Sequence, residues 1–99
     1  MGSNSFDIIV VLFNSEKWII HFFNSIIKSE FDLKKIHLHF LDNNSQDNSL
    51  SLIENLKNNN QTKFGSFNLT KSSINLGFGK ANNIASKNSK TDFLFFFKY

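Results

Sequence analysis

The feature that most constrains the fold is an apolar run near the start of the chain, residues 7–13 (DIIVVLF). A strand that is exposed on one face alternates apolar with polar residues, whereas a run that is apolar after its first residue indicates burial on both faces. Strands of that kind are typical of parallel sheets that carry helices on both sides. A second such run, residues 92–97 (DFLFFF), predicts a buried and central strand near the other end of the chain.

Patterns typical of helices separate the expected strands. Apolar residues recur at helical spacing in residues 16–30, and Trp18 and Ile20 are expected to widen their face; the recurring residues are Ile19, Phe22, Phe23, Ile26 and Ile27. Strand and helix alternate along the chain, which requires parallel strands joined by right-handed crossovers. We therefore expect a Rossmann-like α/β fold with strands at 7–13, 36–41, 66–70 and 92–97 and helices at 16–30, 49–57 and 77–85.

The length of the chain, 99 residues, allows one domain with one modest core. We expect residues 1–6 to be a disordered leader and residues 7–99 to form the domain. No helix is expected after the last strand, which leaves that strand uncovered on one side, so the pattern predicts a truncated domain. The uncovered strand and the 13 phenylalanines leave self-association into a homo-oligomer open.

The composition excludes several classes of protein. Cysteine is absent, which excludes disulfides and thiolate metal sites and favours a cytoplasmic protein. The longest apolar runs have the length of strands, well short of the roughly 20 residues of a membrane-spanning helix. The net charge of +3 comes from scattered lysines, so no nucleic-acid groove is expected. This mild charge leaves open an anionic ligand or a peripheral contact with the inner face of an anionic membrane.

Polar residues follow two of the expected strands, at the place where parallel sheets bind ligands. Asn14 closes the first strand and Asp42 closes the second. Because the carboxyl ends of parallel strands meet at one edge of the sheet, we expect Asn14, Asp42 and Lys98 to share that edge. A simpler interpretation is that these short polar residues only make turns and cap helices, with Asn14 and Ser15 before the first helix and Asp47 before the second.

A segment with two glycines, residues 75–83 (NLGFGKANN), opens the third expected helix. Glycine permits close approach of a ligand to the backbone, and a helix N-terminus favours phosphate. The segment lacks the third glycine of a dinucleotide-binding fingerprint, and Lys80 is not followed by the Ser or Thr of a P-loop. Simple winding of the chain predicts this segment at the opposite end of the sheet from Asn14 and Asp42, with the alternative that the loop before it folds over the ligand crevice.

Metal and nucleophile sites receive little support from the sequence. His37 and His39 share one face of a strand, which suits a metal pair but is more typical of an amphipathic strand near a sheet edge. Asp42 and Asp47 could share a metal ion, but Asp47 is better placed as a helix cap. No Ser-His-Asp or Cys-His arrangement can be assembled. The residues alone therefore indicate a fragment that binds nucleotide or phosphate, with no reaction assigned.

Four segments in register resemble the amino-terminal half of a family-2 glycosyltransferase with the GT-A fold, in particular its rhamnosyltransferase-like members. The segments are IVVLFN (9–14), LDNNSQDNS (41–49), NLGFGKANN (75–83) and DFLFFF (92–97). The resemblance covers almost the whole chain from residue 7 onward. It implies that the partner is a nucleoside-diphosphate sugar and that the acceptor is a cell-surface polysaccharide or glycolipid.

The same resemblance implies which residues contact the donor. The end of the first strand and Asp42 would hold the nucleotide base, because a carboxylate accepts a hydrogen bond from a base N–H. The segment with two glycines would pack beside the diphosphate and the sugar, and Asn82 stands where many relatives carry an arginine. The candidate nucleotide-sugar-binding residues are Phe13, Asn14, Asp42, Asn44, Asn75, Gly77, Asn82 and Asn83.

After the fourth strand, the family carries an Asp-containing motif that binds Mg²⁺ or Mn²⁺, and the metal offsets charge on the departing nucleoside diphosphate. Lys98 and Tyr99 occupy the first positions after that strand here. Sugar transfer by this chain alone is therefore not expected, and no catalytic or metal-binding residue is assigned. The alternative is a catalytically inactive nucleotide-binding or interaction module. A flavodoxin-like signalling domain is disfavoured, because Asp42 would then need acidic partners near the end of the first strand.

Overall fold

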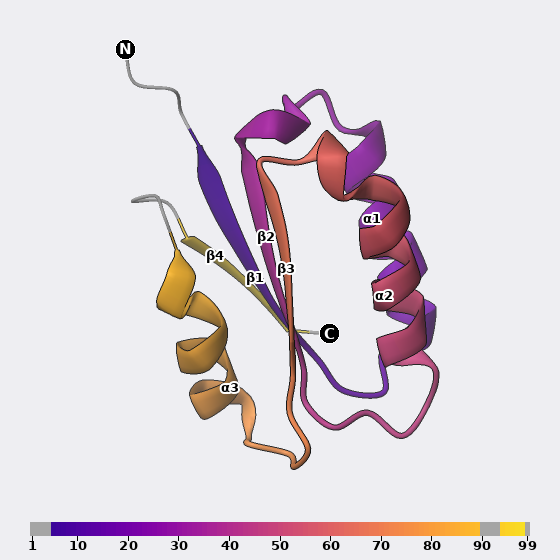
Figure 1. Cartoon of the computed structure of the whole chain (residues 1–99), viewed down its shortest axis with the longest axis vertical. Coiled ribbons are helices and arrows are strands. Elements are labelled where there is room, and N and C mark those ends of the chain that lie inside the picture. Colours follow the sequence, from indigo (N-terminus) through magenta and orange to yellow (C-terminus); the bar gives the residue numbers. More distant parts are fainter. Residues whose placement is uncertain (1–4, 90–93, 99) are drawn as a thin grey trace.

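The computed structural model describes residues 5–89 and 94–98 of the chain (Figure 1). Strands and helices alternate as the sequence predicts. The strands are β1 (Phe6–Leu12), β2 (Ile36–Asp42), β3 (Ser66–Lys71) and β4 (Leu94–Lys98), and the helices are α1 (Glu16–Lys28), α2 (Ser49–Asn60) and α3 (Phe78–Ala85). The first strand begins at Phe6, one residue inside the expected leader, whose residues 1–4 lie outside the described part.

All the described strands are parallel and lie in the order β3-β2-β1-β4. The expectation of a parallel α/β sheet is confirmed, but the expectation that the fourth strand is central is wrong for the described residues, where β4 pairs with β1 alone. An apolar run indicates that both faces of a strand are covered, but it does not indicate how many strands pair with it. Among the described strands, β1 and β2 each have a neighbour on both sides, and in β1 Val10 lies opposite Phe40 of β2 and Phe97 of β4.

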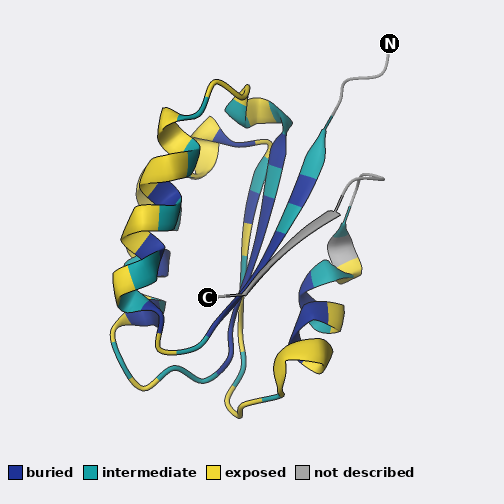
Figure 2. Cartoon of the chain, turned by 180° about the vertical axis from the view of Figure 1, so that it is seen from behind, coloured by how far each residue is buried: buried dark blue, intermediate teal, exposed yellow. Residues whose placement is uncertain are grey.

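Helices cover both faces of the sheet, with α1 and α2 on one side and α3 on the other (Figures 1 and 2). Alternate residues of β1 therefore enter two separate cores. Val10 and Leu12 join the core beneath α1 and α2, whereas Ile9 and Val11 pack with Ala81 of α3. This division explains why β1 is apolar at successive positions.

Aromatic rings fill much of the core beneath α1 and α2. Phe23 of α1 lies 5.8 Å from Phe64 and 6.1 Å from Phe67, between ring centroids, and Phe40 stacks on Phe67 at 5.3 Å. Burial of Phe23 follows the helical spacing of α1, but Ile27 is 37% exposed, and Ile20 is 41% exposed and does not widen the buried face. Successive helical residues differ by about 100°, so Ile20 points away from the direction of its neighbour Ile19.

At the amino-terminal end of the sheet, Gly65 lets the chain pass close to another turn before it enters β3. A Cβ at Gly65 would lie 2.5 Å from the carbonyl oxygen of Lys34 and 2.9 Å from Cε1 of His37. The Gly65 N–H donates to the carbonyl oxygen of Ile36 at 2.9 Å.

In the described part of the chain, no helix combines the length and the apolar character needed to cross a bilayer.

Candidate functional site

Three loops meet at the carboxyl-terminal edge of the sheet, which is the lower edge in Figure 1. They follow β1, β2 and β3 and lead into α1, α2 and α3 in turn. Hydrogen bonds that join residues more than 30 positions apart tie each of these loops to another. The edge is therefore a connected polar surface.

Asn14 joins the loop after β1 to the loop after β2. Its backbone N–H donates to Ser45 Oγ at 3.0 Å, and its Oδ1 accepts from the Gln46 N–H at 2.8 Å. Asn14 adopts a left-handed backbone with φ of 50°, and Asn44 does so with φ of 65°. Asparagine tolerates this region better than most residues, which accounts for its use at both turns.

Two carboxylates cap the starts of α1 and α2 reciprocally. Asp47 Oδ2 accepts from the Glu16 N–H, and Glu16 Oε1 accepts from the Asn48 N–H, both at 3.3 Å. Asp47 Oδ1 also accepts from the N–H of Ser49 at 2.9 Å and from its hydroxyl at 2.6 Å. The N-cap position of the second helix is held by Asn48 and not by Asp47 as expected, but the Asp47 side chain still binds the start of that helix. The same residue also binds the start of the first helix, whose N-cap residue Ser15 donates its hydroxyl to the carbonyl of Phe13.

These contacts set the charge state of Asp47. Burial alone would raise the pKa of the Asp47 carboxyl, but the hydrogen bonds from the Ser49 hydroxyl, the Ser49 N–H and the Glu16 N–H outweigh it and lower the pKa below its ordinary value of 3.8. Asp47 is therefore held as a carboxylate by the two helix starts. Its oxygens are used in the fold, which argues against the metal pairing of Asp42 with Asp47 considered from the sequence.

Asp42 has an oxygen without a partner. The residue is 3% exposed, and its Oδ2 accepts from the Ser45 N–H at 3.1 Å. Its Oδ1 is buried and accepts no hydrogen bond from any residue that the structure describes. A buried, unpaired carboxylate oxygen is costly, so such atoms in a native fold call for an explanation. A ligand that offers an N–H or O–H donor supplies one.

Asn43 brings the segment with two glycines to the same edge. Its Nδ2 donates to Asn75 Oδ1 at 3.0 Å, and its Oδ1 accepts from the Leu76 N–H at 2.7 Å. The expectation that this segment lies at the opposite end of the sheet is wrong. Since β3 runs parallel to β2, its chain leaves at the carboxyl edge, and α3 must begin there to return to the other end.

The start of α3 leaves backbone surface open at this edge. Gly77 has φ of 80° and ψ of 157°, and an added Cβ there would meet no heavy atom within 4 Å. The Asn75 Oδ1 accepts from the Gly77 N–H at 2.8 Å, and no side chain among the described residues caps the helix itself. An uncapped helix start beside a glycine is an arrangement that favours an anionic ligand.

The structure gathers most of the residues expected at the site. The turn residues and the start of α3 share the carboxyl edge; these are Phe13, Asn14, Asp42, Asn44, Asn75 and Gly77. Asn82 and Asn83 lie further along α3, where Asn82 is buried and Asn83 is exposed. Asn43 was missed by the sequence reasoning. Its only signal was its place directly after Asp42, because the contacts that make it a link lie 32 and 33 positions away.

Comparison with known proteins identifies the family. The sequence profile of glycosyl transferase family 2 matches residues 7–97. The chain belongs to this family. Two curated relatives are the poly(ribitol-phosphate) beta-N-acetylglucosaminyltransferases TarS of Staphylococcus aureus strains Mu50 and MW2, each 30% identical over 91 residues. The aligned region covers 92% of this chain but only 15% of each relative.

Solved structures of S. aureus TarS share the fold of this family-2 chain. A crystal structure of TarS 1–349 gives a TM-score of 0.80 at 30% identity, covering 94% of this chain and 26% of that one. The complex of TarS 1–349 with UDP gives 0.79 at 29% identity over the same shares of the two chains. The complex with UDP-GlcNAc gives 0.79 at 30% identity, covering 93% and 25%. The match confirms the GT-A fold expected from the sequence for this part of the family.

The two histidines of β2 serve the fold of this glycosyltransferase chain. His39 is 2% exposed and its Nε2 lies 2.6 Å from Oδ1 of Asp7, which is fully buried. His37 Nδ1 lies 2.9 Å from Ser66 Oγ. The two do share a face, but β2 is flanked by β1 and β3 and is not near a sheet edge. The described residues contain no group of three or more His, Cys, Asp or Glu that could hold a metal ion.

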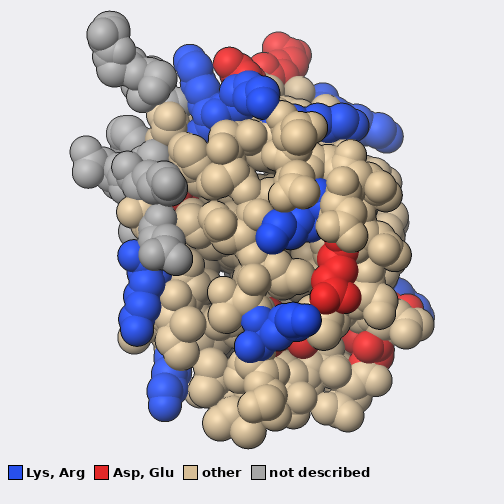
Figure 3. Space-filling view, in the orientation of Figure 1, with Lys and Arg blue, Asp and Glu red and all other residues tan. Residues whose placement is uncertain are grey.

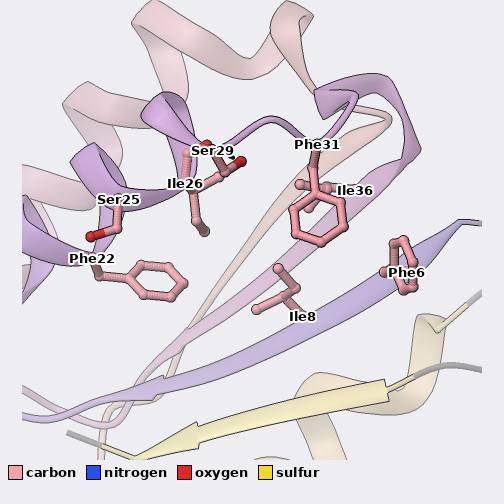
Figure 4. Close-up of a pocket in the computed structure, with 8 residues that line it drawn as sticks. All are labelled: Phe6, Ile8, Phe22, Ser25, Ile26, Ser29, Phe31 and Ile36. Atoms are coloured by element: carbon pink, nitrogen blue, oxygen red, sulfur yellow. Dashed lines mark hydrogen bonds between the residues drawn. The ribbon is translucent and has the colours of Figure 1, made fainter.

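A separate apolar cavity of about 370 Å³ opens at the other end of the sheet in this family-2 chain (Figure 4). The hydroxyls of its two serines already donate to helix carbonyls, Ser25 to His21 at 2.9 Å and Ser29 to Ile26 at 2.7 Å. Its lining offers no charge and consists of Phe6, Ile8, Phe22, Ser25, Ile26, Ser29, Phe31 and Ile36. The cavity is therefore unsuited to a charged donor.

Lysines are spread over the face of the molecule shown in Figure 3 and do not gather in one patch.

Proposed function

We propose that this chain forms the donor-nucleotide pocket of a glycosyltransferase that transfers a sugar from a nucleoside-diphosphate sugar to a cell-surface polysaccharide or glycolipid. The observation that carries the proposal is the unpaired Oδ1 of the buried Asp42, at the edge where parallel sheets bind ligands. The proposal places the protein in the cytoplasm, where nucleotide sugars are the donors, with its acceptor at the inner face of the membrane.

The chemistry of Asp42 favours a nucleoside over a bare phosphate. A carboxylate and the oxygens of an ionised phosphate are both negatively charged, and both only accept hydrogen bonds, so they repel each other. A base such as uracil offers an N–H, and a charged acceptor makes that bond stronger than a neutral one. Because Oδ1 is closed to solvent in this conformation, binding includes a rotation of the Asp42 carboxylate or of the turn that follows it. The TarS structures with UDP and UDP-GlcNAc make UDP the first nucleotide to test.

The start of α3 suits the diphosphate. Gly77 leaves space at the helix start, and the first N–H groups of a helix carry partial positive charge. Lys80 is exposed within the first turn and adds a full charge. The loop after β3 is fixed to β2 by Asn43, so the base and phosphate sites would keep a constant separation.

The chain spans 15% of the length of its curated relatives, so the transfer step belongs to the proposal and not to the residues described. The family resemblance implies Mg²⁺ or Mn²⁺, which would offset charge on the leaving nucleoside diphosphate. No group of metal ligands forms within residues 5–89 and 94–98, so no step is assigned to a metal here. For this chain by itself, the activity that we propose and test is nucleotide binding.

Isothermal titration of the chain with UDP, with and without Mn²⁺, tests the proposal. We expect Asp42→Asn, which keeps the shape of the side chain, to weaken UDP binding about tenfold or more, as for loss of a charged hydrogen bond. Glu30→Gln is the matched control, because it removes one carboxylate from an exposed position. Equal affinity of Asp42→Asn and the unmodified chain, or no binding of UDP at all, would contradict the proposal.

A further inference from the structure

The buried side chain of Asn82 has an acceptor that the fold does not use. Asn82 is 8% exposed, and its Oδ1 accepts no hydrogen bond from the described residues. Asn43, a second buried asparagine among the residues whose burial is described, uses both its Oδ1 and its Nδ2 in bonds to the loop before α3. Buried amide oxygens in native folds are nearly always paired, so the unpaired Oδ1 of Asn82 points to a partner outside the chain.

Helix geometry places Asn82 on the flank of α3 that leads to its open start. Ala81 and Ala85 face the sheet, since they pack with Ile9 and Val11. With about 100° between successive residues, Asn82 lies on one flank of this buried stripe and Ile84 on the other. Phe78, one turn earlier, shares the flank of Asn82 and adjoins Gly77, where the backbone is open. A ligand seated at the start of α3 is thus one helical turn from Asn82.

The chemistry of the free atom restricts its partner. An amide oxygen only accepts hydrogen bonds, so it cannot pair with the oxygens of a diphosphate. We propose that Asn82 Oδ1 accepts a hydrogen bond from a hydroxyl of the bound nucleotide sugar, either on the ribose or on the transferred sugar. Asn82 then selects ligands by their hydroxyl groups. This inference rests on the proposed function, because it needs a nucleotide sugar at the same edge.

The Oδ1 of Asn82 exposes less than 1 Å² in the present conformation, so ligand binding includes a rotation of its side chain. That requirement distinguishes a binding role from a structural one. A structural asparagine stabilises the free protein, whereas an unpaired buried oxygen does not. Replacement by the isosteric Leu removes the oxygen without leaving a cavity, so we expect Asn82→Leu to unfold at a temperature no lower than the unmodified chain.

Titrations of the unmodified chain and of Asn82→Leu with UDP, 2′-deoxy-UDP, 3′-deoxy-UDP and UDP-GlcNAc test the inference. Asn55→Leu, the same change at an exposed position of α2, is the matched control and should bind as the unmodified chain does. We expect Asn82→Leu to weaken UDP-GlcNAc about tenfold, equivalent to about 1.4 kcal/mol. If the partner is a ribose hydroxyl, Asn82→Leu weakens the binding of UDP as much as that of UDP-GlcNAc. The deoxy analogue that lacks this hydroxyl then binds Asn82→Leu and the unmodified chain with equal affinity. If the partner is a sugar hydroxyl, UDP and its deoxy analogues bind unchanged.

Unchanged affinity for every ligand would overturn the inference, as would an equal loss for UDP and both deoxy analogues, which indicates a contact with phosphate or base. A lower unfolding temperature of unliganded Asn82→Leu would also overturn it, because the oxygen would then serve the fold. If UDP binding depends on Asp42 but neither UDP nor UDP-GlcNAc binding depends on Asn82, the inference alone fails. If the unmodified chain binds none of the nucleotides, the inference and the proposed function fail together.

Discussion

Gly77 provides the sharpest test of the geometry at the start of α3. Its φ of 80° and ψ of 157° lie in a region that is open almost only to glycine. A Cβ there would meet nothing within 4 Å, so Gly77→Ala introduces backbone strain without a steric clash. Strain of this kind costs about 1–3 kcal/mol. For a domain of this size, each kcal/mol lowers the unfolding temperature by about 4–8 °C.

Two matched variants separate backbone strain from other effects. Gly79→Ala also adds a Cβ in open space, but within a helix, where alanine is favoured by up to about 1 kcal/mol. We expect urea and thermal unfolding to show a loss for Gly77→Ala and a gain or no change for Gly79→Ala. Gly77→Asn should also lose stability, because asparagine tolerates the left-handed helical region but not a ψ near 157°. Full stability of Gly77→Ala, or rescue by Asn, would refute the reasoning.

Three further predictions concern the rest of the fold. Gly65→Ala should destabilise the chain by more than Gly77→Ala in urea unfolding, because its Cβ would lie 2.5 Å from the backbone oxygen of Lys34, which cannot move aside easily. The pKa of the Asp47 carboxyl is lower in the folded chain than its ordinary value of 3.8, so the folded chain binds a proton at Asp47 less tightly than the unfolded chain does. The contribution of the Asp47 carboxylate to stability is therefore present above pH 3.8 and is lost as the pH falls through the folded pKa. Acid titrations followed by circular dichroism should show a smaller loss of stability in this range for Asp47→Asn. His39→Leu should cost about 1–3 kcal/mol because it removes the hydrogen bond between the buried side chains of His39 and Asp7, whereas the double change with Asp7→Leu should recover part of that loss.

Local patterns in the sequence were sufficient to predict the class of fold. Residues 7–13 are apolar after Asp7, residues 36–41 alternate apolar residues with His37 and His39, and the spacing of Ile19 and Phe23 is helical, so each element could be placed within a few residues. The position of β4 could not be predicted in the same way. Strand order depends on pairing between distant segments, and the hydrophobic run of residues 92–97 contains no information about its neighbours.

The candidate site was only partly predictable for a similar reason. Asp42 could be recognised because it ends a strand, and the edge to which a parallel strand delivers its last residue is fixed. The role of Asn43 depends on the loop before α3, and the role of Asp47 depends on Glu16, 31 positions away. Asn, Asp and Ser bond to any nearby backbone group, so their types alone do not reveal which loop they hold.

The contacts at the carboxyl edge divide its polar residues into two groups. The first group forms hydrogen bonds between loops and consists of Asn14, Asn43 and Asp47. Substitutions in this group should lower the stability of the fold more than they change the affinity for a ligand. Asp42 and Asn82 each keep one buried oxygen that the described residues leave unpaired. Asp42 lies at the carboxyl edge and Asn82 lies in α3, which begins at that edge, and we propose that a ligand rich in hydrogen-bond donors supplies the missing partner of each. A nucleotide sugar, with its base N–H and several hydroxyls, has that chemistry, whereas inorganic phosphate or diphosphate does not.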